Sequence, residues 1–485
     1  MPNWLIKRAF LSPDRKAVEI EGQSYTFAQL LDLALQMAGR FHTIGIQKGD
    51  TIGILQHNSM KLIVTIHALM QSGTKIVFYN TRLSAEELAY QFEDSGMDWL
   101  VSSQVFNETL AKSGLAKEKI IFTESVDDIK ESMDFQPVED FNLQETATIM
   151  YTSGTTGRPK GVMQSFGNHW WSAMGSMLNL GLQEEDTWLC AVPLFHISGL
   201  SILMRSVIYG MTVQVHPQFD VKKVNKAILD GKIAIMSVVS NMLNRLMDDL
   251  GERTYPKAFR CMLLGGGPAP LSLLETCKSR EVPIYQTYGM TETSSQIATL
   301  SPEYSLAKLG SAGKALFPSQ LKVVHEGKPA APLITGEIYV KGPNVTKGYA
   351  HREQATKEAF ENGWLKTGDL GYLDEEGFLF VVDRRSDLII SGGENVYPAE
   401  IESALMKHEA VYEAGVTGVP DERWGQVPIA FVVSKNQHLK TGELLEFCQS
   451  RLASYKVPKE IHLVDDLPRN ASNKLLRRQL VKLLR

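Results

Sequence analysis

The sequence contains few cysteines, and they are scattered. Cys190, Cys261, Cys277 and Cys448 are the 4 cysteines among 485 residues, and they form no CxxC pair and no spacing typical of metal ligands. Proteins that depend on a disulfide framework are small, secreted and much richer in cysteine. The pattern therefore argues against such a framework and favours a reducing compartment.

A long apolar run is also missing. The N-terminal stretch MPNWLIKRAFLSPDRK has no apolar segment as long as a signal peptide needs. No later stretch approaches the roughly 18 consecutive apolar residues of a membrane span. We therefore expect a soluble protein that stays in the cytoplasm.

The third absence is a surplus of positive charge. The chain has 50 Lys and Arg against 55 Asp and Glu, which gives a formal net charge of −5. Nucleic-acid-binding proteins usually carry a basic surplus or a basic face, so the composition gives no reason to expect such a partner. The 44% hydrophobic and 22% charged content is that of an ordinary globular protein. The length exceeds that of a single compact core.

Strand-like and helix-like patterns alternate in the first part of the chain. TIGIL (51–55) and KIVFYN (75–80) are apolar strands, and the segments 60–73 and 84–96 between and after them have helical spacing. The alternation recurs in residues 233–267. Strands that alternate with helices of 10–15 residues predict βαβ units and a mostly parallel sheet, hence an α/β fold. The strands are apolar throughout, as expected when helices cover both faces of the sheet.

The pattern changes after about residue 310. The segments 319–328, 336–342 and 377–385 are short, partly alternating strands separated by Gly and Asp, which predicts an antiparallel sheet or a small barrel. After DRRSD (383–387) helices and strands mix in an α+β module of about 100 residues, a size that can fold. We place the domain boundary there, between 1–383 and 384–485.

The stretch YTSGTTGRPKG (151–161) joins a strand, ATIMYT, to a return strand, GVMQSF, which precedes a helix capped near Asn168. Gly154 and Gly157 permit close approach of the backbone, and successive N–H groups in such a loop can wrap a triphosphate. A Walker A loop is excluded because Lys160 follows Pro159. A flexible linker is the alternative, but it would not need ordered cations and a proline. The polar groups are those of Thr152, Ser153, Thr155, Thr156, Arg158 and Lys160.

Further motifs follow this loop. They are PLFHISG (193–199), GGGPAP (265–270), YGMTET (288–293), TGD (367–369), DRRSD, GGENVYP (392–398) and PRNASNK (468–474). In this order they resemble the adenylate-forming superfamily, which includes acyl-CoA synthetases, adenylation domains of peptide synthetases, and luciferases. The resemblance implies a large N-terminal domain, 1–383, with parallel α/β subdomains and a small β-barrel-like subdomain that bind ATP and the acid. It also implies a small mobile α+β C-terminal domain, 384–485, with the catalytic lysine and the CoA half-reaction.

The resemblance assigns most of these motifs to MgATP. Glu292 would bind Mg²⁺, as suits a carboxylate when phosphates supply the other oxygens. Tyr288 would stack on adenine, and Asp369 would accept both ribose hydroxyls. Without the resemblance, each motif has another interpretation. Thr291 and Glu292 would be the start of a helix, GGGPAP would be a turn that ends a strand, and Asp383 and Arg384 would be a surface ion pair. The implied ATP contacts are Thr152, Ser153, Gly154, Thr155, Thr156, Lys160, Gly265, Gly266, Gly267, Pro268, Ala269, Tyr288, Gly289, Met290, Thr291, Asp369 and Arg384.

The resemblance assigns catalytic roles to Lys474, His196 and Thr291. Lys474 would bridge the substrate carboxylate and the α-phosphate, where a positioned cation stabilises the developing charge. The family commonly has Gly before this lysine, whereas Asn473 stands here, and Asn tolerates left-handed backbone next best. Ser386 occupies the position expected for the hinge between the domains, where many members carry Lys or Asp.

The acid should bind between HISG and YGMTE. The resemblance makes His196 a gate between the ATP and acid sites, although a buried structural histidine is the alternative. Arg205 lies in the apolar helix SGLSILMRSVIYG, where it would be costly to bury unpaired. It therefore either extends outward to solvent or meets an anion. The expected acid contacts are His196, Ser198, Arg205, Ser294 and Ser295.

Within the superfamily, residues 165–182, 195–205, 265–270 and 467–477 resemble members that act in menaquinone biosynthesis. This implies that the acid is 2-succinylbenzoate, with its second carboxylate on Arg205. No carrier domain and no phosphopantetheine attachment site follow the last motif, which favours free coenzyme A as the acceptor. The resemblance therefore implies ATP, Mg²⁺ and coenzyme A.

Three alternatives stay open. A CoA ligase for a medium-chain fatty acid or a benzoate would have an apolar acid pocket, and Arg205 argues against it. A luciferase-type oxygenase shares the adenylation half, but no feature favours it. A catalytically inactive binding protein is disfavoured by the intact Thr155, Glu292, Asp369 and Lys474. The sequence also leaves the oligomeric state open, a homo-oligomer included.

Overall fold

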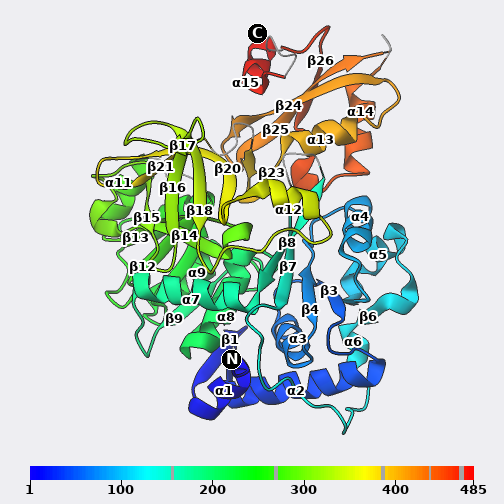
Figure 1. Ribbon diagram of the computed structural model, residues 1–485, viewed down its shortest axis with the longest axis vertical. Helices are drawn as coiled ribbons and strands as arrows, with labels where there is room; N and C mark the ends of the chain where they lie inside the picture. Colours follow the sequence, from blue (N-terminus) through cyan, green and yellow to red (C-terminus); the bar gives the residue numbers. More distant parts are fainter. Residues whose placement is uncertain (154–157, 267–270, 384–387, 436–438, 469–474, 485) are drawn as a thin grey trace.

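The structure of the 485-residue chain is a computed structural model, shown in Figure 1. It describes residues 1–153, 158–266, 271–383, 388–435, 439–468 and 475–484. The predicted α/β class is confirmed. A large N-terminal part contains two sheets with helices packed against them, and a small C-terminal module lies above it in the view of Figure 1.

The first sheet carries the phosphate-loop strands at one edge. Among the described residues its order is β6-β5-β3-β4-β7-β8, parallel except for the antiparallel pair β7–β8. Helices α2, α3 and α4 alternate with its strands, which confirms the predicted βαβ pattern. The bounds are α2 Phe27–Ile44, β3 Thr51–Leu55, α3 Met60–Gln71, β4 Lys75–Phe78, α4 Ala85–Ser95, β5 Trp99–Ser102, β6 Ile120–Phe122, β7 Thr146–Ser153 and β8 Pro159–Ser165.

The second sheet has 15 strands among the described residues. Its parallel half contains β10 and β9, then β11, β12 and β13, and helices α7, α8 and α10 pack beside it. The bounds are α7 Phe166–Leu180, β9 Thr187–Cys190, α8 Ile197–Tyr209, β10 Thr212–Val215, β11 Ile235–Val239, α10 Ser240–Leu250, β12 Cys261–Gly265 and β13 Ile284–Met290.

The antiparallel strands after residue 310 continue this second sheet. In the described residues β13 pairs with β14, β14 with β15, and β15 with β21, so the predicted antiparallel sheet is confirmed, whereas its alternative, a small barrel, is wrong because the sheet is open. The strands do not close into a barrel because β21 pairs with β15. Strand β15 continues the sheet through β14 to β13 in the parallel half. The bounds are β14 Ser295–Leu300, β15 Ser311–Ala315, β16 Gln320–His325, β18 Gly336–Lys341, β20 Trp364–Leu373 and β21 Leu379–Asp383.

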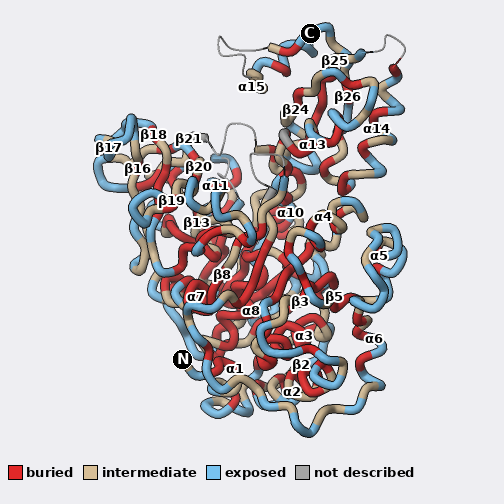
Figure 2. Tube along the Cα trace, turned by 45° about the vertical axis from the view of Figure 1, so that its right-hand side comes forward, coloured by how far each residue is buried: buried red, intermediate tan, exposed pale blue. Residues whose placement is uncertain are grey.

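The C-terminal module has its own sheet and its own core. Ile389, Ile401, Leu405 and Leu444 are among the buried residues of a separate cluster, and Figure 2 shows buried positions inside both parts. The boundary that we predict at 383–387 remains a prediction, because 384–387 lie outside the described residues. The bounds are β22 Ile389–Ser391, β23 Glu394–Val396, α13 Pro398–Leu405, β24 Val411–Asp421, β25 Gly425–Ser434, α14 Thr441–Gln449, η5 Ser454–Lys456 and β26 Glu460–Leu463.

Helix ends follow the expected signals. Helix α2 ends before Gly45, whose φ of 113° suits glycine, and α4 begins after Ser84, whose side chain caps it. The predicted cap of α7 near Asn168 is displaced. Ser165 is the cap, and Asn168 completes a capping box from the third helical position. Among the described residues, no helix is long and apolar enough to cross a bilayer.

Candidate active site

A cavity of about 320 Å³ lies where the carboxyl ends of β7, β12 and β13 meet β20 and the C-terminal module. Ligands of open α/β sheets bind at the carboxyl ends of the strands. Predicted site residues that are far apart in the sequence meet in its wall. They are Thr152, Lys160, His196, Ser198, Arg205, Gly265, Gly266, Gly289, Met290, Thr291, Glu292, Ser295 and Asp369.

The predicted strand–loop–strand connection around the phosphate loop is confirmed on both sides of the loop. Strand β7 ends at Ser153, and antiparallel pairing places Thr152 opposite Lys160. A Cβ added at Gly161 would lie 2.9 Å from the Ile149 side chain, so glycine is required by packing there. The structure thus brings a hydroxyl and a cation to the cavity at the base of the loop.

The turn after β13 is tightly built. A Cβ on Gly289 would lie 2.0 Å from the Ser295 carbonyl oxygen, so only glycine fits. The turn continues as η3 (Thr291–Thr293), and Glu292 is buried with its Oε1 accepting a hydrogen bond of 3.0 Å from the Tyr349 hydroxyl. Glu292 lines the cavity together with Thr291 and Lys160, a donor set that suits Mg²⁺ and phosphate oxygens.

Gly289→Ala should therefore destabilise the protein by about 2–3 kcal/mol and reduce ATP-dependent activity, because overpacking shifts the turn that carries Glu292. Gly442→Ala is the matched control, since nothing lies within 4 Å of a Cβ added there. Urea unfolding measures both variants. Equal stability of the Gly289 variant and the unaltered chain would contradict the packing argument.

Asp369 reaches the cavity from β20 and is held from behind by Tyr288. The Tyr288 hydroxyl donates to Asp369 Oδ2 at 2.7 Å, and both residues are buried. Tyr288 belongs to the core cluster under the antiparallel strands, and it is not in the described wall of the cavity. This hydrogen bond fixes the orientation of the Asp369 carboxylate, and the stacking of Tyr288 on adenine stays a prediction.

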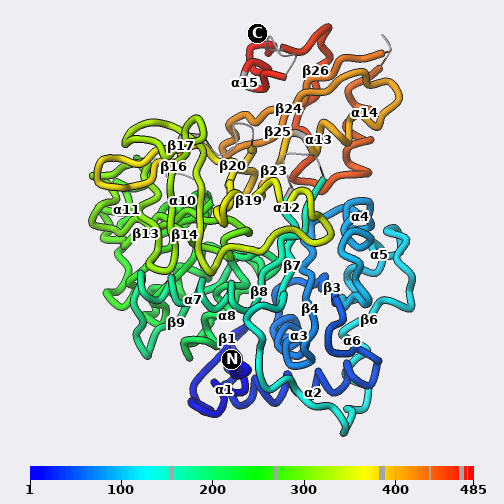
Figure 3. Tube along the Cα trace, viewed as in Figure 1, coloured from blue at the N-terminus to red at the C-terminus, as the bar shows by residue number. Residues whose placement is uncertain are grey.

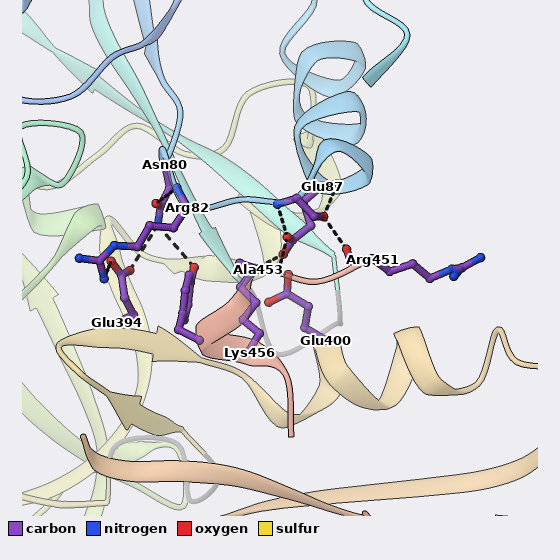
Figure 4. A network of polar contacts seen from close by, with 10 residues as sticks. Asn80, Arg82, Glu87, Glu394, Glu400, Arg451, Ala453 and Lys456 are labelled. Atoms are coloured by element: carbon purple, nitrogen blue, oxygen red, sulfur yellow. Dashed lines mark hydrogen bonds and ion pairs between the residues drawn. The ribbon is translucent and has the colours of Figure 1, made fainter. Parts of the chain in front are cut away.

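His196 meets a carboxylate of the C-terminal module. It is the cap residue of α8, and its Nε2 lies 3.2 Å from Oε2 of Glu394, in the GGENVYP motif on β23. Arg82 pairs with the same carboxylate at 3.1 Å, and the Asn80 side chain donates to it (Figure 4). Burial alone would raise the pKa of Glu394, but His196, Arg82 and Lys456 together hold it below the usual value. Sequence reasoning missed Glu394, although an acidic residue inside a glycine-rich motif was a usable signal.

A lowered pKa means that ionised Glu394 stabilises the folded chain. The free energy of unfolding of the unaltered chain should exceed that of Glu394→Gln above about pH 4.5, the ordinary pKa of this group. The difference should vanish as the pH falls through the lower folded-state value. Urea titrations of both proteins between pH 3 and 7 test this. A difference that grows toward low pH would contradict the sign of the shift.

Arg205 is buried in the wall of the cavity. It is 1% exposed, its guanidinium lies 5.1 Å from the centre of the Trp188 ring, and Nη2 donates to Ser295 Oγ at 3.4 Å. Its Nε has no partner, and among the described residues it forms no ion pair with a carboxylate. Burial lowers the pKa of Arg205. Of the two alternatives for Arg205, this burial contradicts extension to solvent, and the geometry favours contact with an anion in the cavity.

Of the three serines predicted to contact the acid, Ser198 and Ser295 line the cavity and Ser294 does not. Ser295 lines the cavity, whereas Ser294 is fully buried and its carbonyl accepts a hydrogen bond from Ser172. Ser294 has a φ of 52°, and this left-handed turn directs it into the protein behind the cavity wall. The predicted contact of Ser294 with the acid is not supported by this geometry.

A second cavity of about 1060 Å³ adjoins the first at His196, Ser198 and Glu394. It runs between α10 and the C-terminal module, and Trp424 contributes an aromatic wall. Its lining includes five acidic side chains, Glu19, Glu21, Asp220, Asp230 and Glu394, and an equal number of basic ones. Its basic residues are Arg82, Lys223, Lys226, Lys232 and Arg245.

Several predicted residues cannot be placed. Gly154, Thr155, Thr156, Gly267, Pro268, Ala269, Arg384, Ser386 and Lys474 lie outside the described residues, as does the side chain of Ser153. Their roles stay predictions.

Comparisons with known proteins agree with this geometry. The family model described as AMP-binding enzyme matches residues 6–350, and the model of the AMP-binding enzyme C-terminal domain matches residues 400–474. The 2-succinylbenzoate–CoA ligase of Geobacillus sp. strain WCH70 is 57% identical over 486 residues, which covers 100% of this chain and 98% of that protein. That of Geobacillus kaustophilus is 56% identical, with the same coverage.

Solved structures of o-succinylbenzoate CoA synthetase from Bacillus subtilis are similar to this chain along its whole length. A double mutant bound to the product analogue OSB-NCoA has a TM-score of 0.95 at 50% identity, covering 99% of this chain and 98% of that one. The complex with ATP and magnesium has a TM-score of 0.78 at the same identity, covering 99% of both chains. The complex with the acyl-adenylate intermediate also has a TM-score of 0.78.

Proposed function

This chain belongs to the family of AMP-binding enzymes, and from this premise we propose that it ligates 2-succinylbenzoate to coenzyme A. The reaction consumes ATP, passes through an acyl-adenylate and yields 2-succinylbenzoyl-CoA, AMP and pyrophosphate, a step of menaquinone biosynthesis. Relatives that carry out this ligation are 57% and 56% identical over the full chain. Because the scattered cysteines favour a reducing compartment, we also propose a cytoplasmic location.

The observation that carries the choice of acid is buried Arg205. A monocarboxylate would use its only carboxylate in the reaction and leave this cation without an anionic partner. 2-Succinylbenzoate has two carboxylates, so one can be activated while the other offsets the charge of Arg205. Ser295, hydrogen-bonded to Arg205, lies beside the same part of the cavity.

In the first step an oxygen of the succinyl carboxylate attacks the α-phosphorus of ATP, and the bond from this phosphorus to pyrophosphate breaks. Thr152 and Lys160 face the phosphates, and Asp369, oriented by Tyr288, accepts the ribose hydroxyls. Glu292 would hold Mg²⁺, which neutralises phosphate charge when bound, and Thr291 would bind the α-phosphate. We propose that Lys474 supplies the cation between carboxylate and phosphate.

In the second step the sulfur of coenzyme A attacks the acyl carbon and AMP leaves. The second cavity opens onto the first beside His196 and Glu394, so a pantetheine chain can pass between the N-terminal part and the C-terminal module. Its lysines and arginines suit the phosphates at the other end of coenzyme A.

The test is CoA-dependent release of pyrophosphate with ATP, Mg²⁺ and four acids: 2-succinylbenzoate, benzoate, octanoate and 4-coumarate. We expect a strong preference for 2-succinylbenzoate, with its CoA thioester identified by mass. Preference for a monocarboxylate would keep the reaction class and overturn the substrate. No pyrophosphate with any acid would favour an inactive binding protein.

A further inference from the structure

A buried ion-pair cluster joins the N-terminal part to the C-terminal module. Lys456, at the end of η5, is 3% exposed as a residue, and its Nζ lies 2.6 Å from Glu87 Oε1 and 2.7 Å from Glu400 Oε1. Glu400 lies on α13 of the same module, whereas Glu87 lies on α4 of the N-terminal part. Figure 4 shows the ammonium of Lys456 between the two carboxylates, and the chain trace in Figure 3 places α4 directly beneath the module.

The second oxygen of Glu87 also spans the two parts. Oε2 accepts from the backbone N–H of Ala453 at 2.7 Å and from that of Ser84 at 2.9 Å. The Ser84 hydroxyl in turn donates to the carbonyl of Arg451. The capping box that starts α4 therefore also binds residues 451–456 of the module.

The two carboxylates that pair with Lys456 have different roles. Burial alone would lower the pKa of Lys456, but Glu400 and Glu87 raise it, so the lysine is charged at neutral pH. When Glu87 is removed, the pair of Lys456 with Glu400 remains inside the module. Glu87 thus contributes to docking of the module rather than to its fold.

The docked arrangement matches one state of the Bacillus subtilis protein. That protein superposes on this chain with a TM-score of 0.95 when bound to the product analogue, against 0.78 when bound to ATP and magnesium. Identity and coverage are nearly the same in both comparisons, so the two scores differ through the arrangement of the chain. The contacts of Glu87 belong to the arrangement that resembles the product-analogue complex.

We propose that Glu87 is a positioning residue for thioester formation, which latches Lys456 and the Ala453 N–H and so holds the module where coenzyme A can reach the acyl-adenylate. The inference rests on the proposed function, because it assigns Glu87 to the second half-reaction. Apart from the cap contact with Ser84, the side-chain contacts of Glu87 in the described residues lie with the module, so we assign Glu87 no part in adenylation.

The test separates the two half-reactions in Glu87→Gln, which keeps a side chain that can complete the capping box but removes the charge. ATP–pyrophosphate exchange with 2-succinylbenzoate, without coenzyme A, measures adenylation. Single-turnover conversion of preformed 2-succinylbenzoyl-AMP with coenzyme A measures thioester formation. We expect exchange within about 2-fold of the unaltered protein and a loss of at least about 10-fold in thioester formation, since a buried pair is broken.

Glu86→Gln is the matched control. It makes the same change on the same helix, but Glu86 is 44% exposed in its pairs with Lys407 and Arg451 of the module, and exposed pairs contribute little. Both of its half-reactions should stay within about 2-fold. Equal losses of both half-reactions in Glu87→Gln, or no loss in either, would contradict the proposed positioning role of Glu87. If the unaltered protein shows no exchange, the proposed function is wrong, and so is the assignment of Glu87 to thioester formation.

Discussion

Replacing Arg205 by methionine should raise the KM for 2-succinylbenzoate about 100-fold and leave the KM for ATP unchanged. A charged pair that forms in a buried site typically contributes several kcal/mol, and tenfold in affinity corresponds to about 1.4 kcal/mol. Methionine keeps most of the volume, so the wall of Trp188 and Ser295 is retained. Steady-state kinetics with either substrate varied gives both constants.

Arg205→Met should weaken binding of the acid without lowering the stability of the ligand-free protein. Because Arg205 has no carboxylate partner in the described residues, its charge costs folding energy in the ligand-free protein. The free energy of unfolding of Arg205→Met should be equal to or higher than that of the unaltered chain. An unchanged KM for the acid, or a strong loss of stability, would show that Arg205 has a structural task.

Lys474→Ala should lower the rate of acyl-adenylate formation by about 10²–10³, which is typical when a positioned group that stabilises transition-state charge is removed. Thioester formation from preformed 2-succinylbenzoyl-AMP should change little. Pyrophosphate exchange and single-turnover assays measure the two rates separately.

Lys482→Ala is the control for Lys474, because Lys482 is an exposed lysine near the same end of the chain. It should leave both rates unchanged. Equal losses of both half-reactions in Lys474→Ala would contradict a specific role of this lysine in adenylation.

Local features of the fold could be predicted because local physics decides them. The strand at 51–55, the cap of α4 at Ser84 and the end of α2 at Gly45 depend on a few neighbouring residues. The open sheet could not be predicted in the same way. Whether β21 closes a barrel or pairs with β15 depends on partners about 70 residues away, and alternation of polar and apolar residues is the same in both cases.

The candidate site also combines features that local sequence predicts with features that depend on distant residues. Among the described residues of the motifs, Thr152, Gly265, Gly266, Gly289 and Thr291 line one cavity. Ser294 and Ser295 have the same chemistry and both have positive φ, but only Ser295 lines the cavity, which the sequence does not indicate. The contacts His196–Glu394 and Glu87–Lys456 join residues 198 and 369 positions apart, so docking of the two parts brings them together, and no local pattern marks them.

The measurement that tests the choice of substrate most directly compares 2-succinylbenzoate with 4-oxo-4-phenylbutanoate, which lacks the ring carboxylate but keeps the succinyl group. Pyrophosphate exchange is measured with both acids in the unaltered protein and in Arg205→Met. The unaltered protein should prefer 2-succinylbenzoate by about 100-fold in kcat/KM, and the variant should lose most of this preference. A preference of the same size in both proteins would contradict recognition of the second carboxylate by Arg205.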